Sequence, residues 1–219
     1  RRMTDLLPGK VVFSSSLGQE DQVITDSIFR HDLSVRVFTL DTGRLFNETY
    51  ELLDRTTARY KKPIQVYFPR PEDVEEFVAA NGINSFYESV DNRKACCHIR
   101  KVKPLNRALE GASVWITGLR AEQSENRKDM PMIEWSAERN LYKFNPLINW
   151  SFAEMMNYIN EYNVPYNRLH DRGFISIGCA PCTRAIEPGE DARAGRWWWE
   201  NSHKECGLHS PPKTALQTQ

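Results

Sequence analysis

The sequence predicts an α/β fold, in which helices cover both faces of a mostly parallel sheet. Short apolar runs at residues 10–16, 35–40, 64–68 and 113–118 have the length and composition of buried strands. Helical spacing follows the first three runs, which gives the β-α-β rhythm of a parallel sheet. A chain of 219 residues suits one sizeable core, so we expect a single domain over residues 1–209.

The first predicted strand runs into a loop of small and polar residues. The loop contains Ser14, Ser15, Ser16, Gly18, Glu20 and Asp21, and apolar residues with helical spacing follow from Val23 to Phe29. A strand, a small-residue loop and a helix N-terminus together direct backbone N–H groups at an anion. The loop lacks the Gly-Lys-Ser/Thr of a P-loop, and an ordinary strand-to-helix turn is the alternative.

Polar residues also follow the second predicted strand, which ends at Leu40. They are Asp41, Thr42, Gly43 and Arg44. Open α/β sheets bind ligands at the carboxyl ends of their strands, so Asp41 and Thr42 are placed to hydrogen-bond a ribose or base. Arg44 would stack on the nucleotide or pair with it. A helix-capping turn is the alternative, and helices are predicted at about 48–60 and 72–81.

The middle of the chain continues the pattern with weaker signals. The strand at 113–118 ends in a turn at Gly118, and the polar stretch 119–127 is expected to line the opening of a site. Short strands are predicted near Ile133 and Tyr142. Ser151 and Glu154 form a capping box that opens a helix to about Tyr162. After Pro165 the chain is rich in loops, and the tryptophans at 197–199 are expected to pack against the core.

Four of the five cysteines fall into two tight pairs, Cys96–Cys97 and Cys179–Cys182. Adjacent cysteines do not pair easily with each other, and four thiolates suit either zinc or a [4Fe–4S] cluster. An adjacent pair is awkward around one small ion but reaches two corners of a larger cube. We therefore favour the cluster, with zinc as the alternative. Cations surround the first pair, as an anionic cluster requires.

The fifth cysteine, Cys206, lies near the end of the chain between basic residues. His203, Lys204 and His209 flank it in sequence, and nearby cations lower the pKa of a thiol. Cys206 is therefore a candidate nucleophile; a lone cysteine near a loose chain end is the alternative. We expect a catalytic segment at about 197–209 and a disordered tail at 210–219.

Composition excludes several classes of partner. The chain has 29 basic and 29 acidic residues, so total charge favours neither nucleic acid nor a membrane surface. No apolar run approaches the roughly 20 residues that a bilayer needs. The N-terminus has no apolar signal core, and the cysteine count is odd. These features predict a cytoplasmic protein whose cysteines bind metal or react.

The cysteine motifs resemble those of one enzyme family. Lys94-Ala-Cys-Cys97, Cys179-Ala-Pro-Cys182 and Glu205-Cys-Gly-Leu-His209 are similar to the motifs of the assimilatory adenylyl-sulfate (APS) reductases, close relatives of the PAPS reductases. The loops at 14–21 and 40–44 are similar to the phosphosulfate loop and the adenosine-binding turn of that family. The resemblance extends from about Val11 to His209.

This resemblance implies the adenine-nucleotide α-hydrolase-like fold and a two-step reaction. The Cys206 thiolate would attack the sulfur of adenosine 5′-phosphosulfate, leaving a thiosulfonate that thioredoxin, or glutaredoxin as the alternative donor, reduces to sulfite. By motif position, the cations around the transition state would be Lys101, Arg127, Arg193, Arg196 and His209. The resemblance also suggests a homo-oligomer. Alternatives are a PAPS or dual-specificity reductase and, less favoured, a nucleotide-activating sulfurtransferase of the same fold.

Overall fold

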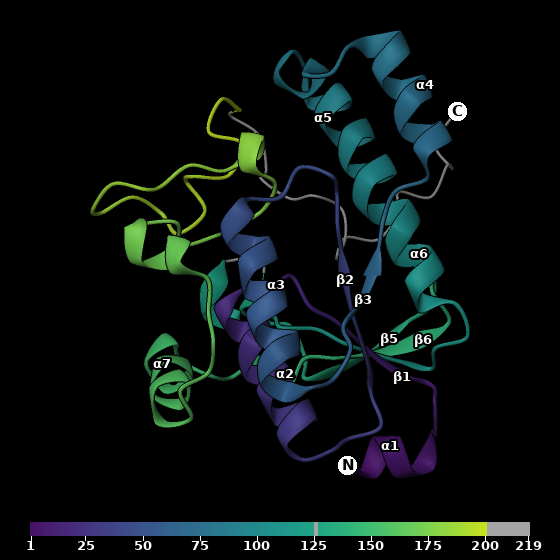
Figure 1. Ribbon diagram of the computed structural model, residues 1–219, viewed down its shortest axis with the longest axis vertical. Coiled ribbons are helices and arrows are strands. Elements are labelled where there is room, and N and C mark those ends of the chain that lie inside the picture. Colours follow the sequence, from purple (N-terminus) through teal and green to yellow (C-terminus); the bar gives the residue numbers. More distant parts are fainter. Residues whose placement is uncertain (125–126, 201–219) are drawn as a thin grey trace.

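The structure is a computed structural model of the chain, and it describes residues 1–124 and 127–200. Its centre is one six-stranded sheet in the order β3-β2-β1-β4-β6-β5 (Figure 1). All neighbours pair in parallel except β5 and β6, which are antiparallel. The predicted fold class is confirmed. The strands are β1 (Val11–Ser14), β2 (Arg36–Leu40), β3 (Gln65–Tyr67), β4 (Val114–Ile116), β5 (Ile133–Ser136) and β6 (Leu141–Phe144).

The α-helices are α1 (Arg2–Leu6), α2 (Gln19–Arg30), α3 (Asn47–Tyr60), α4 (Pro71–Asn81), α5 (Val90–Cys97), α6 (Lys103–Leu109) and α7 (Phe152–Glu161). Helices α2, α3 and α7 pack on one face of the sheet and α6 packs on the other (Figure 1). The sequence predicts most of them, but α1 was not foreseen. In α7 the predicted capping box is confirmed, since Ser151 and Glu154 each accept a hydrogen bond from the backbone of the other. No helix in the described part of the chain is long and apolar enough to cross a membrane.

Alternating strand residues build a core on each face of the sheet. Val11 and Phe13 of β1 pack in a cluster with α2 and α7, whereas Val12 packs with Leu105 and Ala108 of α6 on the other face. This alternation follows from the period of two along a strand. Because helices cover both faces of the sheet, side chains on both sides of the central strands β1 and β4 are buried. The sequences of these strands are therefore largely apolar, as is typical of a parallel sheet.

The long helical segment from α5 to α6 contains a local change of helix type. A π-helical turn, η2 (His98–Val102), separates α5 from α6 directly after the adjacent cysteines. Such turns are rare and often occur at functional sites. Here the turn carries Arg100 and Lys101, which both line the pocket formed with the adjacent cysteines.

The loop-rich segment after Pro165 packs back onto the carboxyl end of the sheet. Its short helical turns are η5 (Arg168–Arg172) and η6 (Ala180–Cys182). The backbone N–H of Ala180 donates to the Arg44 carbonyl at 2.8 Å, which joins this segment to the turn after β2. Trp197 is buried at 1 % exposure, as expected of the tryptophan run, but Trp198 remains 41 % exposed.

Candidate active site

The turn that follows β2 joins two neighbouring pockets at the carboxyl edge of the sheet. Asp41 lines the first pocket, and the next residue, Thr42, lies 3.3 Å from the Cys179 sulfur through its hydroxyl. Arg44, two residues further on, lines the second pocket. The polar residues predicted to bind a nucleotide and the cysteines predicted to hold a metal centre therefore meet along one turn.

The two cysteine pairs converge on the second pocket, although they lie far apart in sequence. Cys97, Cys179 and Cys182 are buried and Cys96 is half-buried, and all four are free thiols. We call this pocket the cysteine pocket. Its lining is Arg44, Phe86, Arg93, Cys96, Cys97, Arg100, Lys101, Cys179 and Cys182. Four of these residues are cationic, so the pocket suits a strongly anionic occupant.

These cations act unequally on the thiols. Burial would raise the pKa of Cys179, but Lys101, the Thr42 hydroxyl, Arg196 and Arg100 outweigh it and hold that pKa below its ordinary value. Burial, followed by the charge of Cys179, raises the pKa of Cys182 to about 12. Cys179 therefore ionises more readily than Cys182, and a second thiolate beside it needs a positive centre to balance the charge.

The donor set consists of four soft ligands, since four cysteine thiols line one cationic pocket. Four thiolates fit either a [4Fe–4S] cluster or a tetrahedral zinc ion.

The loop after β1 is organised by an internal carboxylate. Asp21 Oδ2 accepts hydrogen bonds from the Ser16 backbone N–H at 2.5 Å and the Ser16 hydroxyl at 2.6 Å. Gly118 permits this arrangement, because a Cβ there would lie 1.9 Å from Asp21 Oδ1. Ser15 Oγ accepts from the Leu17 N–H, and Ser14 Oγ accepts from the Trp115 indole. Asp21 thus orders the predicted anion loop from within.

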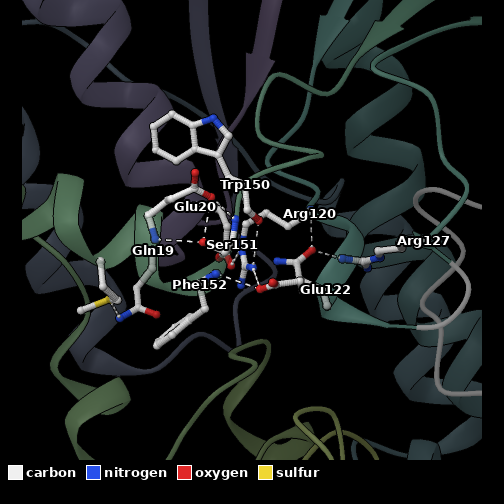
Figure 2. Close-up of polar contacts among 11 residues, drawn as sticks. Gln19, Glu20, Arg120, Glu122, Arg127, Trp150, Ser151 and Phe152 are labelled. Carbon is white, nitrogen blue, oxygen red and sulfur yellow. Dashed lines mark hydrogen bonds and ion pairs between the residues drawn. The ribbon is translucent and has the colours of Figure 1, made fainter.

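Figure 2 shows how the start of α2 is tied to the polar stretch after β4. Glu20 pairs with Arg120 at 3.0 Å, and Arg120 also pairs with Glu122 at 2.9 Å. Arg127 donates to the side chain of Gln123 within the same stretch. Gly18 is the N-cap of α2. The predicted residues Gly18, Glu20, Asp21, Gly118 and Arg127 therefore belong to one connected group at the edge of the sheet.

Beside this group lies the first pocket, which we call the β2–α3 pocket. It has a cavity volume of about 170 Å³ and is lined mostly by apolar side chains that include Leu17, Leu45 and Leu53. Asp41 Oδ1 accepts hydrogen bonds from the Gly43 N–H and the Tyr50 hydroxyl. An apolar pocket with few polar groups suits a planar base. The Leu40 side chain packs on the opposite face of the sheet.

Arg196 approaches the cysteine pocket from the C-terminal side. Its side chain is buried, and Nε has no hydrogen-bond partner among residues 1–124 and 127–200. Gly178 makes room for it, since a Cβ there would lie 2.4 Å from Arg196 Nη2. Arg193 lies three residues earlier and is half-buried, and its backbone carbonyl accepts from the Arg196 N–H. Cys206 and His209 lie outside the described residues.

Comparison with known proteins identifies the family. Residues 10–185 match the phosphoadenosine phosphosulfate reductase domain. The adenosine 5′-phosphosulfate reductase of Agrobacterium fabrum is 54 % identical over 96 % of this chain and 84 % of its own length. The enzyme of the same name from Allochromatium vinosum is also 54 % identical, over 91 % of this chain and 78 % of its own.

The chain belongs to the phosphoadenosine phosphosulfate reductase family. It is an oxidoreductase that acts on a sulfur group, as the motif resemblance implies. Solved structures agree: phosphoadenylyl-sulfate reductase from Candida auris has a TM-score of 0.70 at 31 % identity, covering 84 % of this chain and 87 % of its own. Candida glabrata FMN adenylyltransferase, at TM-score 0.54 and 16 % identity over 94 % and 70 % of the two chains, shares the fold alone.

Sequence reasoning about this reductase missed three residues of the cysteine pocket, Phe86, Arg93 and Arg100. Arg100 is buried and donates to the Thr42 carbonyl at 2.7 Å, which fixes the turn beside Cys179. A signal was present in the sequence. Arg93, the Cys96–Cys97 pair and Arg100 recur at intervals of three or four residues, which places them on one face of a helix.

Asp21→Asn is expected to stabilise the reductase increasingly as pH rises from 4 to 7. Burial raises the pKa of Asp21 to about 6, although the Ser16 hydrogen bonds act in the opposite direction. Because its folded-state pKa exceeds its unfolded value, Asp21 costs stability as pH rises through 6, by up to about 3 kcal/mol. Asparagine stays neutral and keeps an oxygen for Ser16.

Urea unfolding of parent and variant at several pH values measures this difference. Asp54→Asn, a change at an exposed carboxyl, is the matched control. An Asp21→Asn difference that is constant across this range would contradict the prediction.

Proposed function

We propose that this reductase converts adenosine 5′-phosphosulfate to sulfite and AMP in sulfate assimilation. In the first step the Cys206 thiolate forms a bond to the sulfate sulfur, and the sulfur–oxygen bond to the AMP phosphate breaks. AMP leaves with that electron pair, and an S-sulfocysteine remains. In the second step a thioredoxin dithiol supplies two electrons, regenerates the Cys206 thiolate, releases sulfite and becomes a disulfide.

One observation carries this proposal: the turn at Asp41–Arg44 connects an apolar pocket to a cationic cysteine pocket. A nucleotide phosphosulfate needs both environments, one for its base and one for its anionic groups. The β2–α3 pocket would accept the adenine, with Asp41 beside the ribose. The phosphosulfate would then extend toward Arg44, Lys101 and Arg196.

Cations are the chemical requirement of the first step, because an anionic thiolate approaches an anionic sulfate. Preorganised positive charge stabilises such a transition state, and loss of one donor typically costs about 10²–10³ in rate. Lys101 fits this role because it lines the cysteine pocket and lowers the pKa of Cys179. Arg196 fits it because its buried guanidinium has an Nε without a partner in the described part of the chain. We assign Arg127, Arg193 and His209 to the same role by motif position.

Cys96, Cys97, Cys179 and Cys182 would hold a [4Fe–4S] cluster. When bound, it would supply a compact anionic centre that joins α5 to the η6 segment. The chain's own part is to surround that centre with Arg93, Arg100 and Lys101, and so to fix the cations that face the substrate. Four free thiols agree with the reducing cytoplasm, which we propose as the compartment.

A second candidate substrate is 3′-phosphoadenosine 5′-phosphosulfate, the substrate named for the Candida auris relative. Anaerobic assays of sulfite release with each nucleotide, using the same thioredoxin, distinguish the two. We expect the larger kcat/KM with adenosine 5′-phosphosulfate, because the two relatives that are 54 % identical to this chain are named as reductases of that nucleotide. A larger kcat/KM with the 3′-phosphorylated nucleotide would reverse the assignment, and equal values would indicate dual specificity.

A further inference from the structure

The last described residues, Trp197 to Glu200, are fastened to the helix that carries Cys96 and Cys97. Glu200 accepts two hydrogen bonds from Arg93 of α5, Nε to Oε1 and Nη2 to Oε2, each at 2.9 Å. The two side chains are 1 % and 3 % exposed. This is a buried bidentate ion pair between the wall of the cysteine pocket and a segment far along the chain.

Trp197 reinforces the same contact. The Arg93 guanidinium carbon lies 4.5 Å from the centroid of the Trp197 ring, and that of Arg196 lies 4.7 Å from it. Trp197 is almost fully buried. Guanidinium groups stack favourably on aromatic rings, so this arrangement fixes Arg196 as well as Glu200. The start of the C-terminal segment therefore has a defined position against the pocket.

Stability alone is a weak reason for a buried ion pair. Replacement of such a pair by apolar residues is often neutral or stabilising, whereas its planar bidentate geometry specifies one register. Arg93 lies about one helical turn before the adjacent cysteines, so it shares their face of the helix. The pair thus joins α5, which carries Cys96 and Cys97, to the chain at Glu200 in one fixed register.

Cys206 lies six residues beyond Glu200 in the sequence. Six residues span at most about 21 Å when fully extended, so the anchor restricts where this thiol can act. We propose that Arg93 and Glu200 are positioning residues that set the starting point of the segment carrying Cys206, so that the thiol meets the phosphosulfate beside the cysteine pocket. This inference rests on the proposed function; neither residue touches the reacting atoms.

The test is the single-turnover rate at which the holoenzyme acquires the S-sulfo group from adenosine 5′-phosphosulfate without reductant, followed by intact mass. Glu200→Gln removes the charge but keeps the shape. We expect its rate to fall about 10- to 100-fold, the usual cost of misplaced reacting groups. Iron content and AMP affinity should equal those of the parent, because Glu200 does not line either pocket.

Glu190→Gln is the matched control. Glu190 forms a bidentate pair with Arg184 at 2.8 Å, in the same stretch of chain, but both side chains are about one-third exposed and neither lines the cysteine pocket. This variant should form the adduct at the parental rate. The double variant Arg93→Met with Glu200→Leu should react no more slowly than the slower of its two single variants, Arg93→Met and Glu200→Leu, because the losses of two residues that act as one unit are not additive.

A parental rate in Glu200→Gln would overturn the inference, and so would additive losses in the double variant. A slower rate accompanied by an equal loss of iron would also overturn it, since the pair would then serve only the metal centre. Absence of the adduct on the parent would remove the proposed function and this inference with it. The inference fails by itself when the parent forms the adduct and Glu200→Gln forms it equally fast.

Discussion

Cys206→Ser is expected to lower sulfite production by roughly 10⁴-fold or more, the scale of loss when a catalytic nucleophile is removed. A hydroxyl is ionised far less than a thiol at neutral pH, and its sulfate ester has no sulfur–sulfur bond for a dithiol to reduce. The measurement is steady-state sulfite release with saturating nucleotide and thioredoxin.

The control for this variant is its binding behaviour. Cys206→Ser should retain the iron content and AMP affinity of the parent, because the proposed nucleotide and metal sites lie within residues 14–196. A variant that keeps more than about a tenth of the parental rate would contradict covalent catalysis at this position, since the residual rate expected without a nucleophile is far lower.

Cys179→Ser is expected to cause the second largest loss. Cys179 is the thiol with the lowered pKa, and it contacts Thr42 of the nucleotide-side turn. Serine is a hard oxygen ligand where iron–sulfur chemistry requires a soft thiolate. We expect the bound iron to fall below that of one [4Fe–4S] cluster and activity to fall about 10²-fold or more, as for lost metal ligands and their supports.

Thr42→Val distinguishes loss of the proposed metal ligand Cys179 from loss of the Thr42 hydroxyl that contacts it. This variant keeps all four thiols but removes the hydroxyl that lies 3.3 Å from Cys179. We expect near-parental iron and a smaller fall in activity, about tenfold. Iron and activity both at the parental level in Cys179→Ser would refute the assignment of Cys179 as a ligand.

Local sequence pattern predicted the fold well because a buried parallel sheet imposes strong local rules. The runs at 10–16 and 35–40 must be apolar on both sides, since one face packs on α2 and the other on α6. The capping box at Ser151 was equally visible. The π-helical turn after Cys97 was not, because nothing in the sequence near residue 98 distinguishes it from an ordinary helix.

The candidate site was predictable where one short stretch carries the chemistry. Each cysteine pair and the polar turn at Asp41–Arg44 can be recognised from its local sequence alone. The contacts between distant stretches could not be predicted, because they depend on tertiary packing. Examples are the contacts of Thr42 with Cys179 and of Arg93 with Glu200. Asp21 shows the same limit. The sequence places it in the predicted anion loop, and only the structure shows that its carboxylate also accepts two hydrogen bonds from Ser16.

The pockets and their cations suggest how the parts cooperate. The β2–α3 pocket would hold the base, the turn at Asp41–Arg44 would direct the phosphosulfate toward Lys101 and Arg196, and the Arg93–Glu200 pair would set the approach of the thiol. Experiments can separate these contributions. Changes in the β2–α3 pocket should alter nucleotide affinity, whereas loss of the Arg93–Glu200 pair should alter only the rate of thiol attack.

The most direct measurement is the intact mass of the holoenzyme after anaerobic incubation with adenosine 5′-phosphosulfate and no reductant. The account predicts a gain of one SO₃ group on the parent, none on Cys206→Ser, and loss of the group with release of sulfite when reduced thioredoxin is added. An unmodified parent that still contains its iron, or an adduct that persists on Cys206→Ser, would contradict the covalent mechanism.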